Sequence, residues 1–451
     1  MSEDEPRVSH EAERLGPAPP VPAVATEETG PLRRLLGVAA MDVGPLRRHR
    51  EYRLLFAGQA LSFFGAMLTY VAIPYQVYHL TGSSLAVGLL SLAALVPLLV
   101  TAFIGGAFAD AVDRRRMLQL AELALGLATA ILFFNSLLDE PKVWVLFVVT
   151  PLLAAIDGFQ RPALDSMVPR LVSRDELTAA AALDSMRGEF GMIAGPAVGG
   201  ILIATIGLPA TYGIDIATYG ASVVALALMR AVPPPPDAAP PSLGSIVEGM
   251  KYAWSRQELL GSYGVDIVAM FFGMPIALFP AIATQYGGAE VLGLLYAAPA
   301  VGALIASLTS GWASRVHRHG LAIMWAAASW GLAIAVFGLV TQLWVALVFL
   351  GLAGGADMIS GIFRGTLWNQ TIPDRLRGRL AGIEQVSYSS GPLLGNLESG
   401  VAAALFGVRA SVVSGGVLCI VGVGIFAVLL PAFRHYDSRV ATTDNPPVGA
   451  L

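Results

Sequence analysis

The sequence predicts an all-α membrane protein with twelve transmembrane helices, arranged as two pseudo-symmetric bundles of six. Three observations lead to this prediction. Of the 451 residues, 55% are hydrophobic and only 13% are charged, whereas soluble domains usually carry about 25% charged residues. The charges are clustered and leave apolar stretches of about 20 residues, enough to cross roughly 30 Å of hydrocarbon. The two halves of the chain also repeat the same local patterns.

Composition divides the chain into five parts. Residues 1–50 are rich in Pro, Ala and Glu and predict a disordered tail that ends in a basic cluster. Two blocks of six apolar segments follow, at 51–230 and 258–432, joined by a polar linker at 231–257 and ended by a polar tail at 433–451. The apolar segments span residues 54–79, 84–109, 117–137, 143–164, 178–205, 209–229, 259–284, 290–313, 320–340, 343–365, 379–405 and 409–431.

The basic residues predict the orientation of the chain. When the loops are assigned alternately to two sides, one side holds only Lys142 and Arg409. The other side holds most of the remaining basic residues, including Arg114–Arg116, Arg161, Arg170, Arg174, Arg230, Lys251, Arg315, Arg364 and Arg375. Positive charges in short loops resist translocation. We therefore expect a multi-pass protein of the cytoplasmic membrane with both termini in the cytoplasm.

The second block repeats the first at an offset of about 200 residues. The fifth segment carries Gly195-Pro196-x-x-Gly199 and the eleventh carries Gly391-Pro392-x-x-Gly395. The fourth segment ends in Phe159-Gln160-Arg161 and the tenth in Phe363-Arg364, and a proline follows each. Parallel six-helix repeats are typical of secondary transporters, in which the substrate path lies between the halves near the middle of the membrane.

The loop between the second and third segments carries the sharpest local motif. Its small residues allow neighbouring helices to approach closely, and its charged residues can pair with helix ends or with one another. The residues that matter are Gly105, Gly106, Asp110, Asp113, Arg114 and Arg115.

This string resembles the loop motif of the major facilitator superfamily, with Asp113 standing where that motif usually has Gly. The resemblance implies a conformational-switch loop that stabilises the outward-open state through Asp110 and Arg114. We take Asp165, at the end of the fourth segment, as a hypothesis for the partner of Asp110. The alternative is that the basic run only anchors the topology.

The fifth segment carries a second motif, which resembles the antiporter motif of the superfamily's drug exporters. Proline frees a backbone carbonyl inside a helix, and glycines permit tight packing. The motif residues are Gly191, Gly195, Pro196 and Gly199. The resemblance favours export over import, while the near copy in the eleventh segment also fits a role in helix packing alone.

The wider resemblance covers roughly residues 50–432. The strings Arg53-Leu-Leu-Phe-x-Gly58-Gln59 and Val77-Tyr78-x-Leu-Thr81 are similar to the branch that contains the enterobactin exporter and, more broadly, the macrolide-efflux permeases. This resemblance implies siderophore export or multidrug resistance, driven by proton antiport. An importer of a small metabolite stays open, because members of one fold move unrelated compounds.

Ionisable side chains inside the membrane are candidates for function because they are costly to bury. For proton coupling we select Asp157 and Glu189, with Arg187 as the cation that modulates them. Asp184 lies three residues before Arg187, so these two share a helix face and can pair. The alternative is a static ion pair that aligns the fourth and fifth segments. The chain departs from drug exporters in lacking an arginine deep in its fourth segment, where Arg161 lies at the membrane edge.

The cavity candidates are polar side chains that lipid would not tolerate: Gln59, Asp266, Asp357, Glu384 and Gln385, with Asn396 as a further amide of this kind. No zinc-protease, nucleophile-elbow or phosphate-loop pattern occurs, so an enzyme is not expected. One cysteine, Cys419, excludes a disulfide within the chain. We expect no cofactor, metal or nucleic acid, and a monomer whose partners are a small-molecule substrate, protons and the lipid bilayer.

Overall fold

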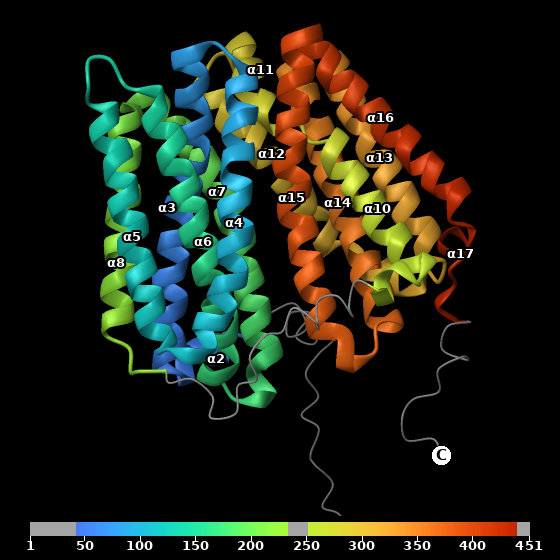
Figure 1. Cartoon of the computed structure of the whole chain (residues 1–451), viewed down its shortest axis with the longest axis horizontal. Coiled ribbons are helices and arrows are strands. Elements are labelled where there is room, and N and C mark those ends of the chain that lie inside the picture. The colour runs from blue at the N-terminus through green and yellow to red at the C-terminus, as the bar shows by residue number, and fades with distance from the viewer. Residues whose placement is uncertain (1–41, 233–250, 440–451) are drawn as a thin grey trace, which may run out of the picture. The chain divides into compact units, whose positions relative to one another are not determined.

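The computed structural model describes residues 42–232 and 251–439, and within these ranges the regular structure is entirely helical (Figure 1). The first half consists of α2 (Gly44–Arg48), α3 (Arg50–Thr81), α4 (Ser84–Ala111), α5 (Arg114–Ser136), α6 (Val143–Leu171), η1 (Arg174–Glu176), α7 (Leu177–Thr205) and α8 (Gly207–Ala227). The second half consists of α10 (Gln257–Phe272), η2 (Ile276–Leu278), α11 (Phe279–Tyr286), α12 (Ala289–Leu308), η3 (Ser310–Arg315), α13 (His319–Leu339), α14 (Leu343–Thr371), α15 (Asp374–Phe406), α16 (Val408–Leu429) and α17 (Pro431–Arg434).

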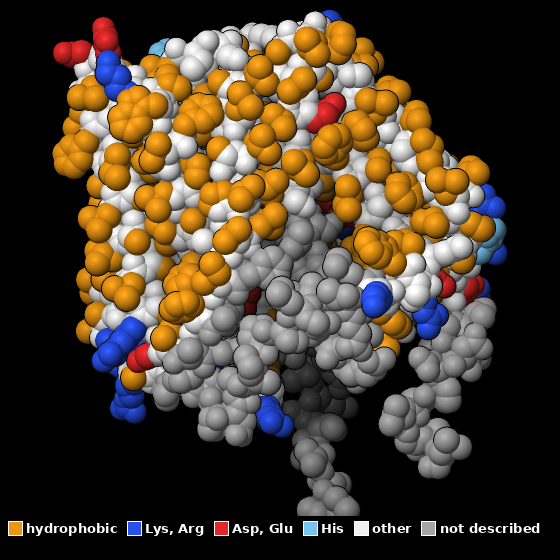
Figure 2. All heavy atoms as spheres, viewed as in Figure 1, with side chains coloured by type: hydrophobic (Ala, Val, Ile, Leu, Met, Phe, Trp, Pro, Cys, Tyr) orange, Lys and Arg blue, Asp and Glu red, His pale blue; other side chains and the backbone are white. Residues whose placement is uncertain are grey.

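The described residues contain 10 helical spans that are long and apolar enough to cross a membrane, with α10, η2 and α11 forming one of them. The helices α8 and α15 have the required length but are less apolar, and together with the ten they give the predicted twelve. Hydrophobic side chains cover the flank of the molecule, while charged side chains gather toward its two ends (Figure 2). This surface suits a bilayer. Most of the N-terminal tail that was predicted to be disordered, of the polar linker and of the polar C-terminal tail lies outside the described residues.

The seventh span is broken, although its sequence predicts one apolar segment at 259–284. Helix α10 ends at Phe272, and the chain resumes helical structure only after Pro275. The carbonyl of Gly273 accepts a hydrogen bond from Trp330 Nε1 at 3.0 Å, and Asn396 Oδ1 accepts one from the Ala277 N–H at 3.1 Å. Side chains from other helices thus satisfy backbone groups that the break frees, as the bilayer interior requires.

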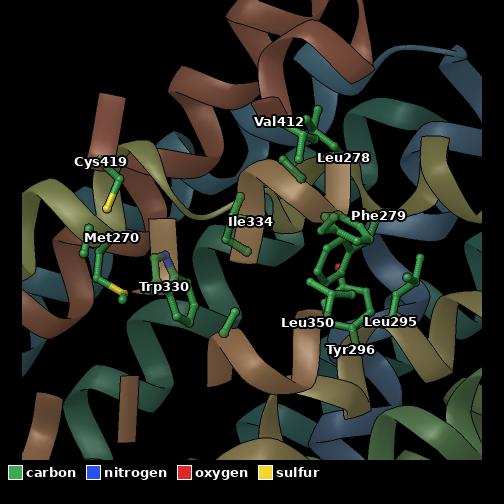
Figure 3. Close-up of a cluster of buried hydrophobic side chains, with 14 of the residues drawn as sticks. Met270, Leu278, Phe279, Leu295, Tyr296, Trp330, Ile334, Leu350, Val412 and Cys419 are labelled. Atoms are coloured by element: carbon green, nitrogen blue, oxygen red, sulfur yellow. The ribbon is translucent and has the colours of Figure 1, made fainter. Parts of the chain in front are cut away.

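The helices of each half pair in the same pattern. In the first half, α3 packs on α7 and α8, α4 on α6, and α5 on α6 and α8. In the second half, α10 packs on α15 and α16, α12 on α14, and α13 on α14 and α16. Figure 3 shows buried side chains of the second half, including Met270, Phe279, Tyr296 and Trp330. The repeated pairing agrees with the sequence repeat.

Across the halves, α4 packs on α15 and α7 packs on α12. We call the end of the helices at which α3 and α5 begin the basic end, and the other the opposite end. A methyl group on Gly88 would lie 2.6 Å from the Asn396 carbonyl, and one on Gly200 would lie 2.5 Å from the Ala289 carbonyl. Asn396 Nδ2 also donates to Ser91 Oγ at 3.2 Å. These close contacts between the halves lie toward the opposite end.

Candidate functional site

The loop motif at the basic end binds backbone groups of neighbouring helices. Asp113 is the N-cap of α5, and its Oδ1 accepts a hydrogen bond from Arg115 N–H at 3.0 Å. The guanidinium of Arg115 donates to the carbonyls of Leu226 and Ala227, each at 2.8 Å. Asp113 accepts a hydrogen bond from a free N–H group at the start of α5. Arg115 donates hydrogen bonds to free carbonyls at the end of α8. The motif therefore ties α5 to α8.

The small residues of this motif act in packing. A methyl group on Gly105 would overlap the backbone of Phe159, so α4 and α6 approach closely there. Arg114 is 4% exposed and thus buried. The surroundings of Gly106 and the side chain of Asp110 are outside the described part of the chain, so the predicted contact of Asp110 with Asp165 stays a prediction.

The glycines of α7 face α3. Methyl groups on Gly191 and Gly195 would strike the side chains of Phe63 and Met67, and one on Gly199 would lie 3.3 Å from Leu68 Cα. Gly200, the next residue, faces α12 of the other half. Helix α7 thus packs closely on two sides, and Pro196 lies between these contacts.

The copy of this motif in α15 packs in the same way. Gly391 and Gly395 face Met270 on α10, whereas Gly400 faces Ser84 on α4 of the first half. The motif therefore makes equivalent helix contacts in both halves, which is consistent with the packing role that its repetition predicts.

The second half contains a buried group of charges. Arg364 on α14, with 3% of its side chain exposed, forms an ion pair with Asp266 on α10, whose side chain is 5% exposed. Its Nη2 lies 3.6 Å from Oδ1 of Asp357, which exposes 42% of its side chain. The structure thus brings together two cavity candidates that the sequence placed separately.

Arg364 was wrongly predicted to be a loop charge that fixes orientation. Instead, it is buried within α14. Two carboxyl groups close to its guanidinium offset the cost of removing this charge from water. Its guanidinium carbon also lies 5.3 Å from the centre of the Tyr388 ring, within range of a cation–π contact. Trp368 packs between the rings of Tyr388 and Tyr263, with ring centroids 6.3 Å and 5.2 Å away. The sequence signal was present, since Arg364 lies seven residues after Asp357 and thus on the same helix face.

The first half carries a looser group of charges on α6 and α7. Arg187 Nε lies 3.7 Å from Asp184 Oδ1, which confirms the predicted pair. The exposed carboxyl group of Asp157 interacts with Arg161 and Gln160, whereas Asp165 interacts with Arg161 and Arg187.

The three residues selected for proton coupling do not form one cluster. Arg187 donates to the Gln59 carbonyl at 3.4 Å and is not among the groups that act on Asp157. Glu189 is partly buried and has no ion pair among the described residues. The cation that acts on the Asp157 carboxyl group is Arg161, not Arg187.

Two cavity candidates lie in the protein interior. Gln59 is 5% exposed, and its Nε2 donates to Glu122 Oε1 at 2.7 Å. Asn396 is 7% exposed and joins α15 to α4 and η2. The side chains of Glu384 and Gln385 lie outside the described residues. Glu122 was missed, although a lone carboxylate in the ninth position of an apolar helix is a signal.

Among the residues that the structure describes, no group of three or more His, Cys, Asp or Glu side chains is arranged to hold a metal ion. The charged groups described above in the two halves are built from ion pairs, amides and carboxyl groups.

We expect Arg364→Gln to destabilise the protein by about 3–5 kcal/mol, because it leaves the Asp266 carboxylate buried without its cation. The double variant Arg364→Gln/Asp266→Asn should recover most of this loss. Thermal unfolding of purified protein in detergent measures both effects. Arg187→Gln is the matched control, with a smaller expected loss, because 16% of the Arg187 side chain is exposed and its pair is 3.7 Å apart. Equal destabilisation by the single and double variants would contradict the assignment.

Comparison with known proteins identifies the family. The family described as transmembrane secretion effector matches residues 40–450. The enterobactin exporter EntS of Citrobacter koseri is 30% identical over 409 residues, covering 89% of this chain and 96% of the relative. EntS of Shigella boydii serotype 18 is 31% identical over 409 residues, covering 88% and 96%.

Solved structures share the fold at low identity. A mutant of the nucleoside transporter NupG has a TM-score of 0.68 at 12% identity, covering 85% of this chain and 98% of that one. A bacterial homologue of the iron transporter ferroportin, in its inward-facing state, has a TM-score of 0.63 at 15% identity, with coverages of 85% and 98%. The twelve-helix architecture, the repeated helix pairing and the match over nearly the whole length agree: this chain is a transporter, not an enzyme, and it belongs to the transmembrane secretion effector family of the major facilitator superfamily.

Proposed function

We propose that this chain is a monomeric exporter that moves a siderophore or a drug-like secondary metabolite out of the cell by proton antiport. The observation that carries the proposal is the similarity to enterobactin exporters at 30–31% identity, covering 88–89% of this chain. This similarity extends through both halves of the chain. We therefore propose that the chain transports in the same direction as these exporters. The resemblance of the α7 motif to the antiporter motif of drug exporters also favours export, although its contacts are those of helix packing.

Orientation follows from the basic end, which we assign to the cytoplasm. The basic residues at the starts of α3 and α5 lie at this end, whereas Lys142 and Arg409 lie at the opposite end. An excess of Lys and Arg in short loops marks the cytoplasmic side. Both termini then face the cytoplasm of the cell membrane.

Transport by alternating access fits the contacts between the halves. Among the described residues, close contacts form where Gly88 meets Asn396 and where Gly200 meets Gly293, both toward the opposite end. With the basic end in the cytoplasm, this arrangement corresponds to a state closed to the outside. Export requires these contacts to separate while others form at the basic end, where the loop motif with Asp110 and Arg114 is placed to act as the conformational switch.

For the cargo site we propose the charged group of the second half. Asp357 and Tyr388 expose 42% and 39%, respectively, next to the buried Arg364. A guanidinium beside aromatic rings suits an aromatic cargo with acidic or hydrogen-bonding groups. Siderophores of the catecholate class have these features. Glu384 and Gln385 remain candidates from α15.

For proton coupling we propose Asp157, which is exposed on α6 and lies close to Arg161. A nearby guanidinium favours the ionised carboxyl group, and movement away from it favours proton uptake. Glu189 remains the second candidate, and Arg187 is the cation that movement of α7 would bring nearer or take away.

Deletion of the gene should lower secretion of one native siderophore or secondary metabolite and raise its level inside the cells. Mass spectrometry of the medium and of cell extracts checks this result, and a drug-susceptibility panel identifies any wider range of cargo. Reintroduction of the wild-type gene should restore secretion. If the compound instead fails to accumulate from outside in the deletion strain, the direction is import and export is wrong.

In proteoliposomes, Asp157→Asn should abolish enterobactin transport driven by a pH gradient and preserve exchange of enterobactin across the membrane. The reason is that exchange needs no net proton movement, whereas coupling needs a carboxyl group that ionises. Asp139→Asn, in an exposed loop of the first half, is the matched control and should behave as wild type. Loss of both activities together would favour a static role for Asp157.

A disulfide at the opposite end should stop transport. The double variant Ser91→Cys/Asn396→Cys, made in a Cys419→Ser background, would link α4 to α15. In this structure Asn396 Nδ2 lies 3.2 Å from Ser91 Oγ. Oxidation should abolish transport, and reduction should restore it. The two single cysteine variants should not respond to oxidation. Unchanged transport by the cross-linked protein would contradict alternating access at this contact.

A further inference from the structure

The packed interior of the first half contains a polar seam. It is formed by α3, α5 and α8, of which α8 packs on both α3 and α5. Each of its members is at most 5% exposed: Gln59, Ser62, Thr69, Glu122, Thr129, Asp215 and Ser222. Residues three and seven positions apart share a helix face, so the members on each helix point into the same interior stripe.

Glu122 is the centre of this seam and is fully buried. Its Oε1 accepts a hydrogen bond from Gln59 Nε2 at 2.7 Å, and its Oε2 accepts one from Ser62 Oγ at 2.7 Å. Ser222 Oγ lies 3.4 Å from the same Gln59 nitrogen. Both carboxyl oxygens are therefore held by neutral donors, which fixes the position of the group without supplying a positive charge.

Asp215 is the second carboxyl group of the seam and is also fully buried. Thr69 Oγ1 donates to its Oδ2, and Thr218 Oγ1 lies 3.4 Å from its Oδ1. Gly65 leaves the space for it, because a methyl group there would lie 2.6 Å from Asp215 Oδ1. The carboxyl groups of Asp215 and Glu122 interact electrostatically.

No lysine, arginine or histidine of the described part of the chain forms an ion pair with Glu122 or Asp215 or acts on them electrostatically. The other titratable groups that face them are acidic or phenolic: Asp157 on α6, and Tyr212 and Tyr219 on α8. Two buried carboxylates without a cation are very costly in a low-dielectric interior. Proton binding removes that cost.

The second half shows that the fold does not require these carboxyl groups. Its corresponding helices α10, α13 and α16 pack in the same pattern. Neither α13 nor α16 contains an Asp or Glu, and Asp266 on α10 is paired with Arg364. A structural requirement of the three-helix packing would apply to both halves. The unpaired carboxyl groups of the first half therefore call for a functional explanation.

We propose that Glu122, supported by Asp215, is a buried proton-binding site of this transporter. Glu122 takes up a proton in one conformation and releases it in the other, and the exposed Asp157 on α6 interacts with it electrostatically. The inference rests on the proposed proton antiport.

Gln59 provides a physical link between this site and the movement of α7. Its side chain binds Glu122, while its backbone carbonyl accepts a hydrogen bond from Arg187 Nη1 at 3.4 Å. A shift of α7 relative to α3 moves the guanidinium with respect to this carbonyl. A shift that brings the guanidinium closer to Glu122 than it lies in this structure favours the ionised form and releases the proton, and retreat favours proton uptake.

Infrared difference spectroscopy of the full-length protein tests the site without any cargo. Spectra are recorded at intervals across about pH 5–9, a range that includes known buried glutamates. We expect wild type to show a protonated-carboxyl carbonyl band that titrates and that Glu122→Gln removes. Asp139→Asn, which changes an exposed loop residue, should leave the band unchanged. The proposal would be overturned if the carbonyl band removed by Glu122→Gln were present at every pH in wild type, or if the variant kept every band of wild type.

Proteoliposome transport of enterobactin provides the second test. Glu122→Gln keeps the shape of the side chain and resembles its protonated form, with one acceptor oxygen and one donor group, so we expect loss of the response to a pH gradient with exchange preserved. If wild type itself shows no response to a pH gradient, the proposed antiport is wrong. If the variant responds as wild type does, only the role of Glu122 is refuted, and the proposed antiport stands. Thermal unfolding checks the fold of the variant. Should it not fold, Glu122→Asp must shift the midpoint of the titrating band, and an unshifted midpoint refutes the site.

Discussion

A polar side chain inside a bilayer finds no water, so its partners must come from the protein. This constraint organises the structure, and the two halves meet it in different ways. The second half pairs Asp266 with Arg364, and it fills the break between α10 and α11 with hydrogen bonds from Trp330 and Asn396. The first half surrounds Glu122 and Asp215 with amide and hydroxyl donors, and none of its described cations pairs with them. The first arrangement holds a charge in place, and the second is the one on which we base the proposed proton-binding site.

Shared packing makes this difference meaningful. Helices α7 and α15 each carry a glycine face toward a helix of their own half and a further glycine toward the other half. The pairs α4–α15 and α7–α12 therefore form equivalent contacts, with small residues that permit close backbone approach. Close contacts of this kind need no strong polar bonds, which is compatible with the alternating access that we propose. The Asn396–Ser91 hydrogen bond is a polar contact at this junction.

Sequence reasoning located most of the helices within a few residues and found the repeat, because apolar length and charge placement are local properties. It missed the break in the seventh span, although Gly273 and Pro275 lie there, since an apolar run does not reveal where a helix stops. It placed Gln59 in the cavity, because it had no means of finding the Glu122 carboxylate on another helix. It treated Arg364 as a loop charge for the same reason.

By itself, then, the sequence determined that the chain is a membrane protein with twelve spans in two related halves, and it identified the superfamily through motifs whose residues are contiguous. The tertiary structure decided which charges have partners. Asp266 and Arg364 are 98 positions apart and meet, whereas Arg187 and Glu189 are two apart and point to different surroundings. The physical reason is that electrostatic and hydrogen-bond energies depend on distances between atoms after the helices have packed, and helix packing brings together residues that no local pattern connects.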